Sequence, residues 1–261
     1  MSPTLRMLIA TAGCVVASAA AEAQWWLDVP TGGVPRTASG EVDVSAPAPR
    51  APDGRPDLSG VWEPIKTYSR DLAEDLVALR EIPYQPWAKA LVADRADGSE
   101  SRDDPPAHCL PQGVPRLAGA PAPWKIVQTP ALTVIIYEAF TLWRQIFTDG
   151  RRLAADVNPT WLGYSSGRWD GDTLVVETRG FNGKSWLDQV GNPSTEQLRV
   201  VERYRRPDFG HLEIEITIDD PGAYTAPWTV RQRANLLVDT DLLEFACNEN
   251  NRDVQHLPGG D

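Results

Sequence analysis

The sequence predicts an all-β protein, an antiparallel meander closed into a lipocalin-like barrel of about eight or nine strands, with short N-terminal helices. One observation is Asp170-Gly171, a tight-hairpin signal that lies between GRW and the β-branched run DTLVVET. Another is the alternation of apolar and polar residues in HLEIEITID, residues 211–219. The last is the succession of strand-like runs after Lys125, with turns and no helices between them. A β-sandwich is the alternative that these patterns leave open.

Residues 1–23 predict a signal peptide. Arg6 supplies a positive charge, an apolar run follows, and Ala21-Glu22-Ala23 has the small residues of a cleavage site. The apolar run is too short to span a bilayer. We therefore expect a periplasmic or secreted protein. The alternative is lipid anchoring at Cys14, which follows two small residues.

The rest of the chain divides into an arm and a barrel domain. Residues 24–57 are rich in Pro, Ala and Gly and predict an arm or linker, and residues 58–256 are expected to form the barrel. A long loop over 96–124 is expected to have a functional or covering role. The expected strands are 125–128, 131–139, 141–148, 161–169, 172–181, 196–206, 211–219, 227–237 and 242–248.

Two short helices are expected before the sheet. Ser69 is placed to cap the first, over residues 70–80, and Pro86 suits the first turn of the second, Trp87–Arg95. The inward residues are expected to be Leu72, Leu76 and Leu79 in the first helix, and Trp87 and Leu91 in the second.

Cysteine usage and charge limit the classes of partner. Cys109 and Cys247 remain after export and predict a disulfide that stabilises the fold by ~4–5 kcal/mol. Two cysteines and three histidines do not favour a metal site, and no cofactor motif is present. The net charge of −11 argues against nucleic acid and anionic membrane surfaces as partners. A small-molecule ligand is expected, and the oligomeric state is left open.

The period-two pattern turns a few polar side chains into the barrel. In 196–206 the apolar phase carries Glu202 inward, while Arg199, Arg203 and Arg205 face outward opposite glutamates of 211–219. The same reasoning places Glu138, Gln232 and either Arg144 or Gln145 inside. Because isolated buried carboxylates are costly, we expect Arg144 to lie between Glu138 and Glu202. Such a cluster is either a structural ion pair network or the polar floor of a site.

Two loops could add ligand contacts. The loop 182–194 contains Trp186 and Asp188, which would cover the barrel mouth and contact a ligand; alternatively, the loop packs its own tryptophan. The segment CLPQGVPR contains Arg116, which would bind an anionic group or pair with Asp103, Asp104 or Asp149.

The motif Ser59-Gly60-Val61-Trp62 resembles the lipocalin/calycin signature, which implies that Trp62 packs at the closed end of a barrel and that a late arginine, here Arg252, packs on it. Residues 57–253 also resemble a large family of exported bacterial proteins of unassigned activity. The matching stretches include PDLSGVW, CLPQGVPR, GRWDGDTLVVETRGFN and ERYRRPDFGHLEIEITIDDPGAYTAPW. Members of that family often have a histidine where this chain has Ser194. The resemblance implies a fold and a compartment but no reaction.

The sequence therefore leads to three functional hypotheses. The first is an exported lipocalin-like protein that binds a small, partly apolar molecule in a Trp-lined cavity, with contacts from Arg144, Gln232, Trp186, Asp188 and Arg116. The second is a periplasmic enzyme of hydrolase or lyase type in which Glu138 and Glu202 perform acid–base catalysis on a carbohydrate or small organic substrate. The third is a structural module of the cell envelope.

Overall fold

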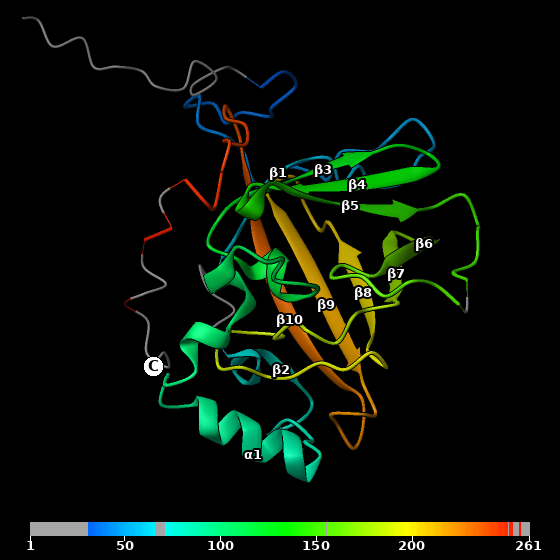
Figure 1. Cartoon of the computed structure of the whole chain (residues 1–261). Helices are drawn as coiled ribbons and strands as arrows, with labels where there is room; N and C mark the ends of the chain where they lie inside the picture. The colour runs from blue at the N-terminus through cyan, green and yellow to red at the C-terminus, as the bar shows by residue number, and fades with distance from the viewer. Residues whose placement is uncertain (1–30, 66–70, 155, 250, 253–255, 257–261) are drawn as a thin grey trace, which may run out of the picture.

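The computed structural model describes residues 31–65, 71–154, 156–249, 251, 252 and 256, and within these ranges nine strands close into a barrel (Figure 1). Each of these strands pairs with the next one along the chain, and the last strand, β10, pairs with the first, β1, to close the barrel. The prediction of a barrel is confirmed, and the signal peptide and Cys14 lie outside the described residues. The strands are β1 (Gly60–Pro64), β3 (Trp124–Gln128), β4 (Leu132–Tyr137), β5 (Leu142–Phe147), β6 (Tyr164–Asp170), β7 (Thr173–Arg179), β8 (Arg199–Arg205), β9 (His211–Asp219) and β10 (Trp228–Leu237).

One strand pair departs from the expected antiparallel meander. β5 and β6 run parallel and pair only at Ile146 with Ser165 and Phe147 with Ser166. The reason is the connection 148–163, which returns the chain alongside β5 before β6 begins. The barrel is therefore mixed, and this seam has the fewest paired residues of the neighbouring strands in its wall.

The strand expected over 242–248 does not form. The edge of β10 that it would need is occupied by β1, which pairs Val61 with Leu237 and Pro64 with Ala234. Residues 242–248 instead run as an irregular segment to Cys247. The first strand of the domain, and not the last, closes the barrel.

The second predicted helix is present as α1 (Pro86–Arg95), with Pro86 in its first turn. Its inward residue is Ala88, whereas Trp87 is 47% exposed and donates its indole N–H to the Gly222 carbonyl. The first predicted helix is wrong beyond one turn. Its residues form the 3-10 helix η1 (Leu72–Asp75), capped by Asp71, and then the short strand β2 (Leu76–Val77); Ser69 lies outside the described residues. Pairing of β2 with β10 replaces the helical turns that the leucine spacing suggested.

The two ends of the barrel differ. At one end, which we call the turn end, the strands are joined by the short connections 129–131, 171–172 and 206–210. At the other, the loop end, lie the long segments 71–123 and 180–198 together with 138–141 and 220–227. Arm residues Val44 and Ala46 accept hydrogen bonds from Gly210 and Phe209, which places the arm at the turn end, while α1 lies at the opposite end (Figure 1).

Trp62 is fully buried near the turn end. Its indole N–H donates to the Leu58 carbonyl at 3.0 Å, and the Arg206 guanidinium lies 4.9 Å from its ring centre. Arg206, and not the expected Arg252, is therefore the arginine that packs on Trp62. Arg206 donates to the carbonyls of Asp57 and Ser59, and burial lowers the pKa of its guanidinium to about 10.

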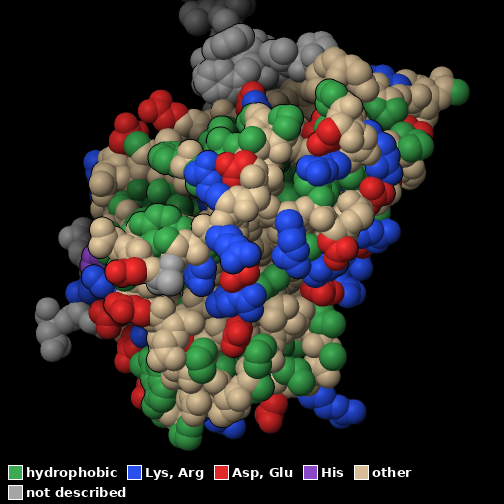
Figure 2. Space-filling model, turned by 90° about the vertical axis from the view of Figure 1, so that its right-hand side faces the viewer, with side chains coloured by type: hydrophobic (Ala, Val, Ile, Leu, Met, Phe, Trp, Pro, Cys, Tyr) green, Lys and Arg blue, Asp and Glu red, His purple; other side chains and the backbone are tan. Residues whose placement is uncertain are grey.

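The alternation predicted for β8 and β9 is confirmed. Val200, Glu202 and Tyr204 point into the barrel with Leu212, Ile214, Ile216 and Ile218. The interior also holds three fully buried tryptophans, Trp62, Trp124 and Trp228. The outward arginines pair with acidic residues, as in Arg205–Glu213 and Arg199–Glu177. Figure 2 shows such interleaved basic and acidic side chains on the face that it presents.

No helix in the described part of the chain combines the length and apolarity needed to cross a membrane.

Candidate functional site

A buried ion pair lies in the barrel interior between β5 and β8. The Arg144 Nη1 donates to Glu202 Oε1 at 3.0 Å, and Nη2 donates to Oε2. The side chains are 2% and 1% exposed. Gln145 points outward, so the choice left open on β5 is resolved in favour of Arg144.

Hydroxyl groups satisfy the remaining atoms of this pair. Arg144 Nε donates to Ser165 Oγ at 2.9 Å and Nη2 to Thr178 Oγ1 at 2.6 Å, while the Tyr204 hydroxyl donates to Glu202 Oε1 at 2.7 Å. Because a fully satisfied network of this kind fixes its members in place, we read the cluster as a rigid part of the core.

Arg144 and the buried tyrosines Tyr137 and Tyr204 keep their protons at neutral pH. Burial alone would lower the pKa of Arg144, but the Glu202 carboxylate outweighs it and raises that pKa. Burial raises the pKa of Tyr137 to about 12 and that of Tyr204 well above its usual value. Neither tyrosine is therefore ready to release a proton at neutral pH.

Glu138 does not belong to this cluster, contrary to the prediction. In β4 the buried residues are Thr133, Ile135 and Tyr137, which is the opposite phase to the one expected. Both phases of LTVIIY are largely apolar, so alternation gave no usable signal there. Glu138 follows the strand, is half-buried, and accepts a hydrogen bond from the backbone N–H of Leu243 at 2.7 Å.

Gln232 lies in the inward phase of β10, between the buried Val230 and Ala234, but it is only half-buried. It lines a groove of about 390 Å³ at the loop end, which is bounded on the other side by η1 and β2. Gln232 is therefore separate from the Arg144–Glu202 pair, which has its full set of partners from β6, β7 and β8.

Trp186 lies in the loop 182–194 and is nearly buried. The guanidinium of Arg95, in the last turn of α1, lies 4.0 Å from the Trp186 ring centre and donates to the Gly191 carbonyl at 2.7 Å. The loop thus packs its own tryptophan against α1, as the structural alternative expected. Trp186 nevertheless also lines a second groove at the loop end.

Asp188 is fully buried beneath this loop. Its carboxylate accepts hydrogen bonds from the backbone N–H of Leu72 at 2.9 Å and of Asn192 at 3.0 Å, and from the Asn192 amide. Burial outweighs these donors and raises the pKa of Asp188 to about 6. Asp188 therefore connects η1 to the loop 182–194, and its oxygens face protein donors.

Two tyrosines add hydrogen bonds to the loop 182–194 beside Asp188. The Tyr84 hydroxyl donates to Asn192 Oδ1 at 2.6 Å, and the Tyr224 hydroxyl donates to the Pro193 carbonyl at 2.8 Å. Ser194 is also buried and donates to the Ser185 carbonyl at 2.7 Å. The position where the resembled family often has histidine thus has a structural hydrogen bond in this chain.

Arg116 lies in the 3-10 helix η4 (Arg116–Gly119) and pairs with Asp104. Both guanidinium nitrogens Nη1 and Nη2 donate to the carboxylate at 2.6 Å. Of the three aspartates considered from the sequence, Asp104 is the partner. The pair borders the second groove, of about 450 Å³, whose lining also includes Gln112, Trp186 and Gln189.

The two grooves adjoin at the loop end. Gly119 lines both of them, so they lie on either side of η4. Gln112 lines the second groove, and its Oε1 is buried and has no hydrogen-bond partner among the described residues. A buried amide oxygen without a partner is costly and can be satisfied by a ligand donor. We call the two grooves together the η4 cleft.

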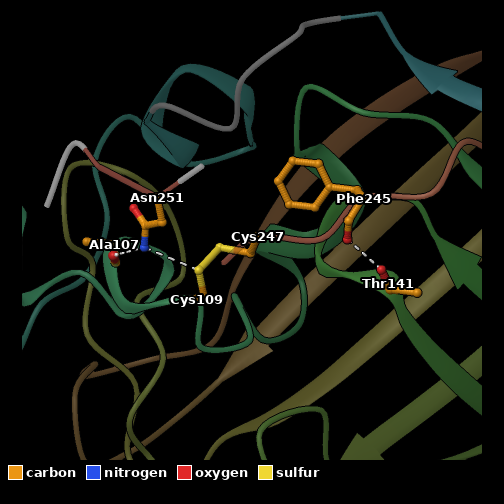
Figure 3. The surroundings of a disulfide bond; sticks show 6 residues. All are labelled: Ala107, Cys109, Thr141, Phe245, Cys247 and Asn251. Atoms are coloured by element: carbon orange, nitrogen blue, oxygen red, sulfur yellow. Dashed lines mark hydrogen bonds between the residues drawn. A yellow bond between two sulfur atoms is a disulfide. The ribbon is translucent and has the colours of Figure 1, made fainter. Parts of the chain in front are cut away.

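The predicted disulfide between Cys109 and Cys247 is present, with Cα atoms 5.6 Å apart (Figure 3). Asn251 adds hydrogen bonds to the Ala107 carbonyl at 3.1 Å and to Cys109 Sγ at 3.3 Å, and Thr141 donates to the Phe245 carbonyl (Figure 3). Pro106 and Ala107 line the second groove. Through the disulfide and Asn251, the C-terminal segment therefore contacts and supports one wall of the η4 cleft.

Several residues of this region escaped sequence reasoning. Gln112 stands within CLPQGVPR, but nothing in the pattern marks its amide as unsatisfied. Tyr84 and Asn192 are separated by 108 positions and meet only through the fold. Within the described ranges, no group of three or more His, Cys, Asp or Glu side chains is arranged to hold a metal ion.

Comparison of the chain with family models, curated proteins and solved structures finds no match.

Proposed function

We propose that this chain is an exported barrel protein that binds a small, partly apolar molecule in the η4 cleft. The observation that carries the proposal is Gln112, which lines a groove of about 450 Å³ and whose side-chain Oε1 is buried without a hydrogen-bond partner among the described residues. That volume lies in the range of small-molecule sites, which combine apolar walls with a few polar groups. The disulfide supports export, because such bonds persist in oxidising compartments.

The wall residues support the same assignment. Trp186 and Pro106 provide apolar surface, and the Arg116–Asp104 pair provides charged hydrogen-bonding groups held in one orientation. On the other side of η4, Gln232 adds a second amide. A ligand with at least one N–H or O–H donor would satisfy Gln112 Oε1 once the amide turns toward the groove, and would cover the apolar wall.

The catalytic alternative loses its geometric basis. It required Glu138 and Glu202 on opposite sides of one open cleft. Glu202 is enclosed with Arg144, whereas Glu138 accepts a hydrogen bond from the Leu243 backbone at the loop end. We therefore assign the polar barrel interior to stability and ligand binding to the loop end.

Native mass spectrometry of the full chain purified from a bacterial periplasm tests the proposal. The wild type is expected to retain a small-molecule adduct that Gln112→Leu loses. The leucine leaves no partner unsatisfied, because Oε1 accepts no hydrogen bond in the protein. The control is Gln197→Leu, an exposed glutamine away from both grooves, which should retain the adduct. An adduct of equal occupancy in Gln112→Leu, or no adduct in the wild type, contradicts the proposal.

A further inference from the structure

The seam between β5 and β6 forms a third groove, distant in sequence from the η4 cleft. β4 and β5 pair along six residues, but β5 and β6 pair only at two positions, so the edge of β5 over Leu142–Gln145 is not covered by β6. A groove of about 360 Å³ lies there, bounded by β5, by residues 151–154 and 157, and by residues 160 and 162–165.

The walls of the seam groove are largely apolar and aromatic. Trp143 is 60% exposed, which is unusual for the largest apolar side chain on a sheet surface. Phe147, Leu153, Val157, Leu162 and Tyr164 complete this wall. Exposed aromatic side chains that gather beside a concave surface mark binding sites more often than isolated ones do.

The charged groups of the seam groove are all cationic. Arg151 and Arg152 line it together with Arg144, which is paired with Glu202, and none of the described lining residues is acidic. Arg151 is held by Asp149 and lies 3.8 Å over the Phe147 ring, so its guanidinium is fixed beside the groove. Arg152 is exposed and has no partner among the described residues.

The seam groove is also fixed in shape. Arg179 donates to the Leu153 carbonyl, and the Tyr164 hydroxyl donates to the Asn158 carbonyl at 3.0 Å. Both bonds tie the connection 148–163 to β6 and β7. A preformed groove lowers the cost of ordering a bound molecule.

We propose that the seam groove is a second binding site, for a small molecule with a planar apolar body and a carboxylate. The apolar body would lie against Trp143 and Tyr164, and the carboxylate would accept hydrogen bonds from Arg152 and face Arg151. The carboxylate would pair with the Arg152 guanidinium, which has no other partner among the described residues. Elsewhere the protein, whose net charge is −11, repels anions.

Isothermal titration of the full chain with two matched probes, 4-phenylbenzoate and 4-phenylbenzyl alcohol, tests this site. The carboxylate is expected to bind more tightly than the alcohol. Arg152→Gln should weaken the binding of 4-phenylbenzoate about fivefold and leave the affinity for the alcohol unchanged. A fivefold loss is the effect expected from removing one exposed charged hydrogen bond. Trp143→Ala should weaken both probes by about tenfold, because both lose the same aromatic contact.

The controls separate this site from the η4 cleft. Arg80→Gln and Trp87→Ala alter an exposed arginine and an exposed tryptophan away from the seam groove and should change neither affinity. Gln112→Leu should also leave both affinities unchanged, so the two proposals fail independently. Absence of binding to the wild type, equal affinity for the two probes, or equal effects of the control variants would overturn the seam site.

Discussion

Two buried arginine–carboxylate pairs differ in what surrounds them. Arg144–Glu202 in the barrel is 2% and 1% exposed, and hydroxyls of β6, β7 and β8 satisfy its remaining atoms. Arg116–Asp104 at the loop end is 6% and 16% exposed and borders a groove lined by Gln112, whose buried amide oxygen has no partner among the described residues. The same pairing chemistry thus stabilises the core in one place and lines a candidate site in the other.

The difference teaches that burial of an ion pair does not identify a binding site. The barrel pair was the more suggestive one in the sequence, because inward charges are rare in a barrel. Its complete hydrogen bonding leaves nothing for a ligand. The site is better recognised by polar atoms that the fold buries and leaves without partners.

The largest expected effect concerns the covalent support of the loop end. The double variant Cys109→Ser/Cys247→Ser should lower the free energy of unfolding by about 4–5 kcal/mol, because the cross-link spans 138 residues and restricts the unfolded chain. Urea unfolding of the variant and the wild type measures this. A decrease below about 1 kcal/mol would show that the loop end is held by its non-covalent contacts alone.

Breaking the Arg144–Glu202 pair should lower the free energy of unfolding nearly as much. Glu202→Gln is expected to lower the free energy of unfolding by about 3–5 kcal/mol, because it leaves the Arg144 charge buried without a counter-charge. Glu215→Gln is the matched control, since Glu215 pairs with Arg231 on the outer face. It should lower the free energy of unfolding by less than about 1 kcal/mol. Equal effects of the two variants, measured by urea unfolding, would break the comparison.

The buried Asp188 beneath the loop 182–194 should make the free energy of unfolding depend on pH. Burial raises the pKa of Asp188 to about 6 from 3.8, so between these values the folded protein binds a proton that the unfolded chain lacks. This group therefore stabilises the fold most below pH 4, and the contribution of about 3 kcal/mol is lost as the pH rises to 6.

Unfolding of the wild type and of Asp188→Asn at several pH values tests this linkage. The stability of the wild type relative to the variant should increase on acidification from pH 7 to pH 4, because the asparagine cannot take up a proton. A difference that is constant over this interval would place the pKa of Asp188 near its usual value.

The smallest expected effect is at the groove pair. Asp104→Asn should lower the free energy of unfolding by only about 1–2 kcal/mol, because water in the groove can solvate the Arg116 guanidinium that remains. Thermal and urea unfolding measure the change. A loss as large as that of Glu202→Gln would mean that the two pairs are energetically alike despite their surroundings.

Much of the fold was predictable from local patterns. The hairpin at Asp170-Gly171, the alternation in 211–219 and the inward position of Glu202 were all expected, and so was the pairing of the two cysteines. Each depends on turn chemistry, period-two geometry or cysteine count, which are properties of short segments or of composition. The phase of β4 was not predictable, since both of its faces are apolar.

The sequence by itself determined a succession of strands with Arg144 or Gln145 and Glu202 directed inward, because side chains alternate along any strand; it predicted a barrel and left a sandwich open. Only the tertiary structure decided that β1 closes the barrel, that β5 and β6 run parallel, and that Glu138 lies outside the cluster. These features depend on register and on the path of long connections, which join residues far apart in the chain. For the same reason, only the fold shows that Gln112, Arg116 and Trp186 line one groove.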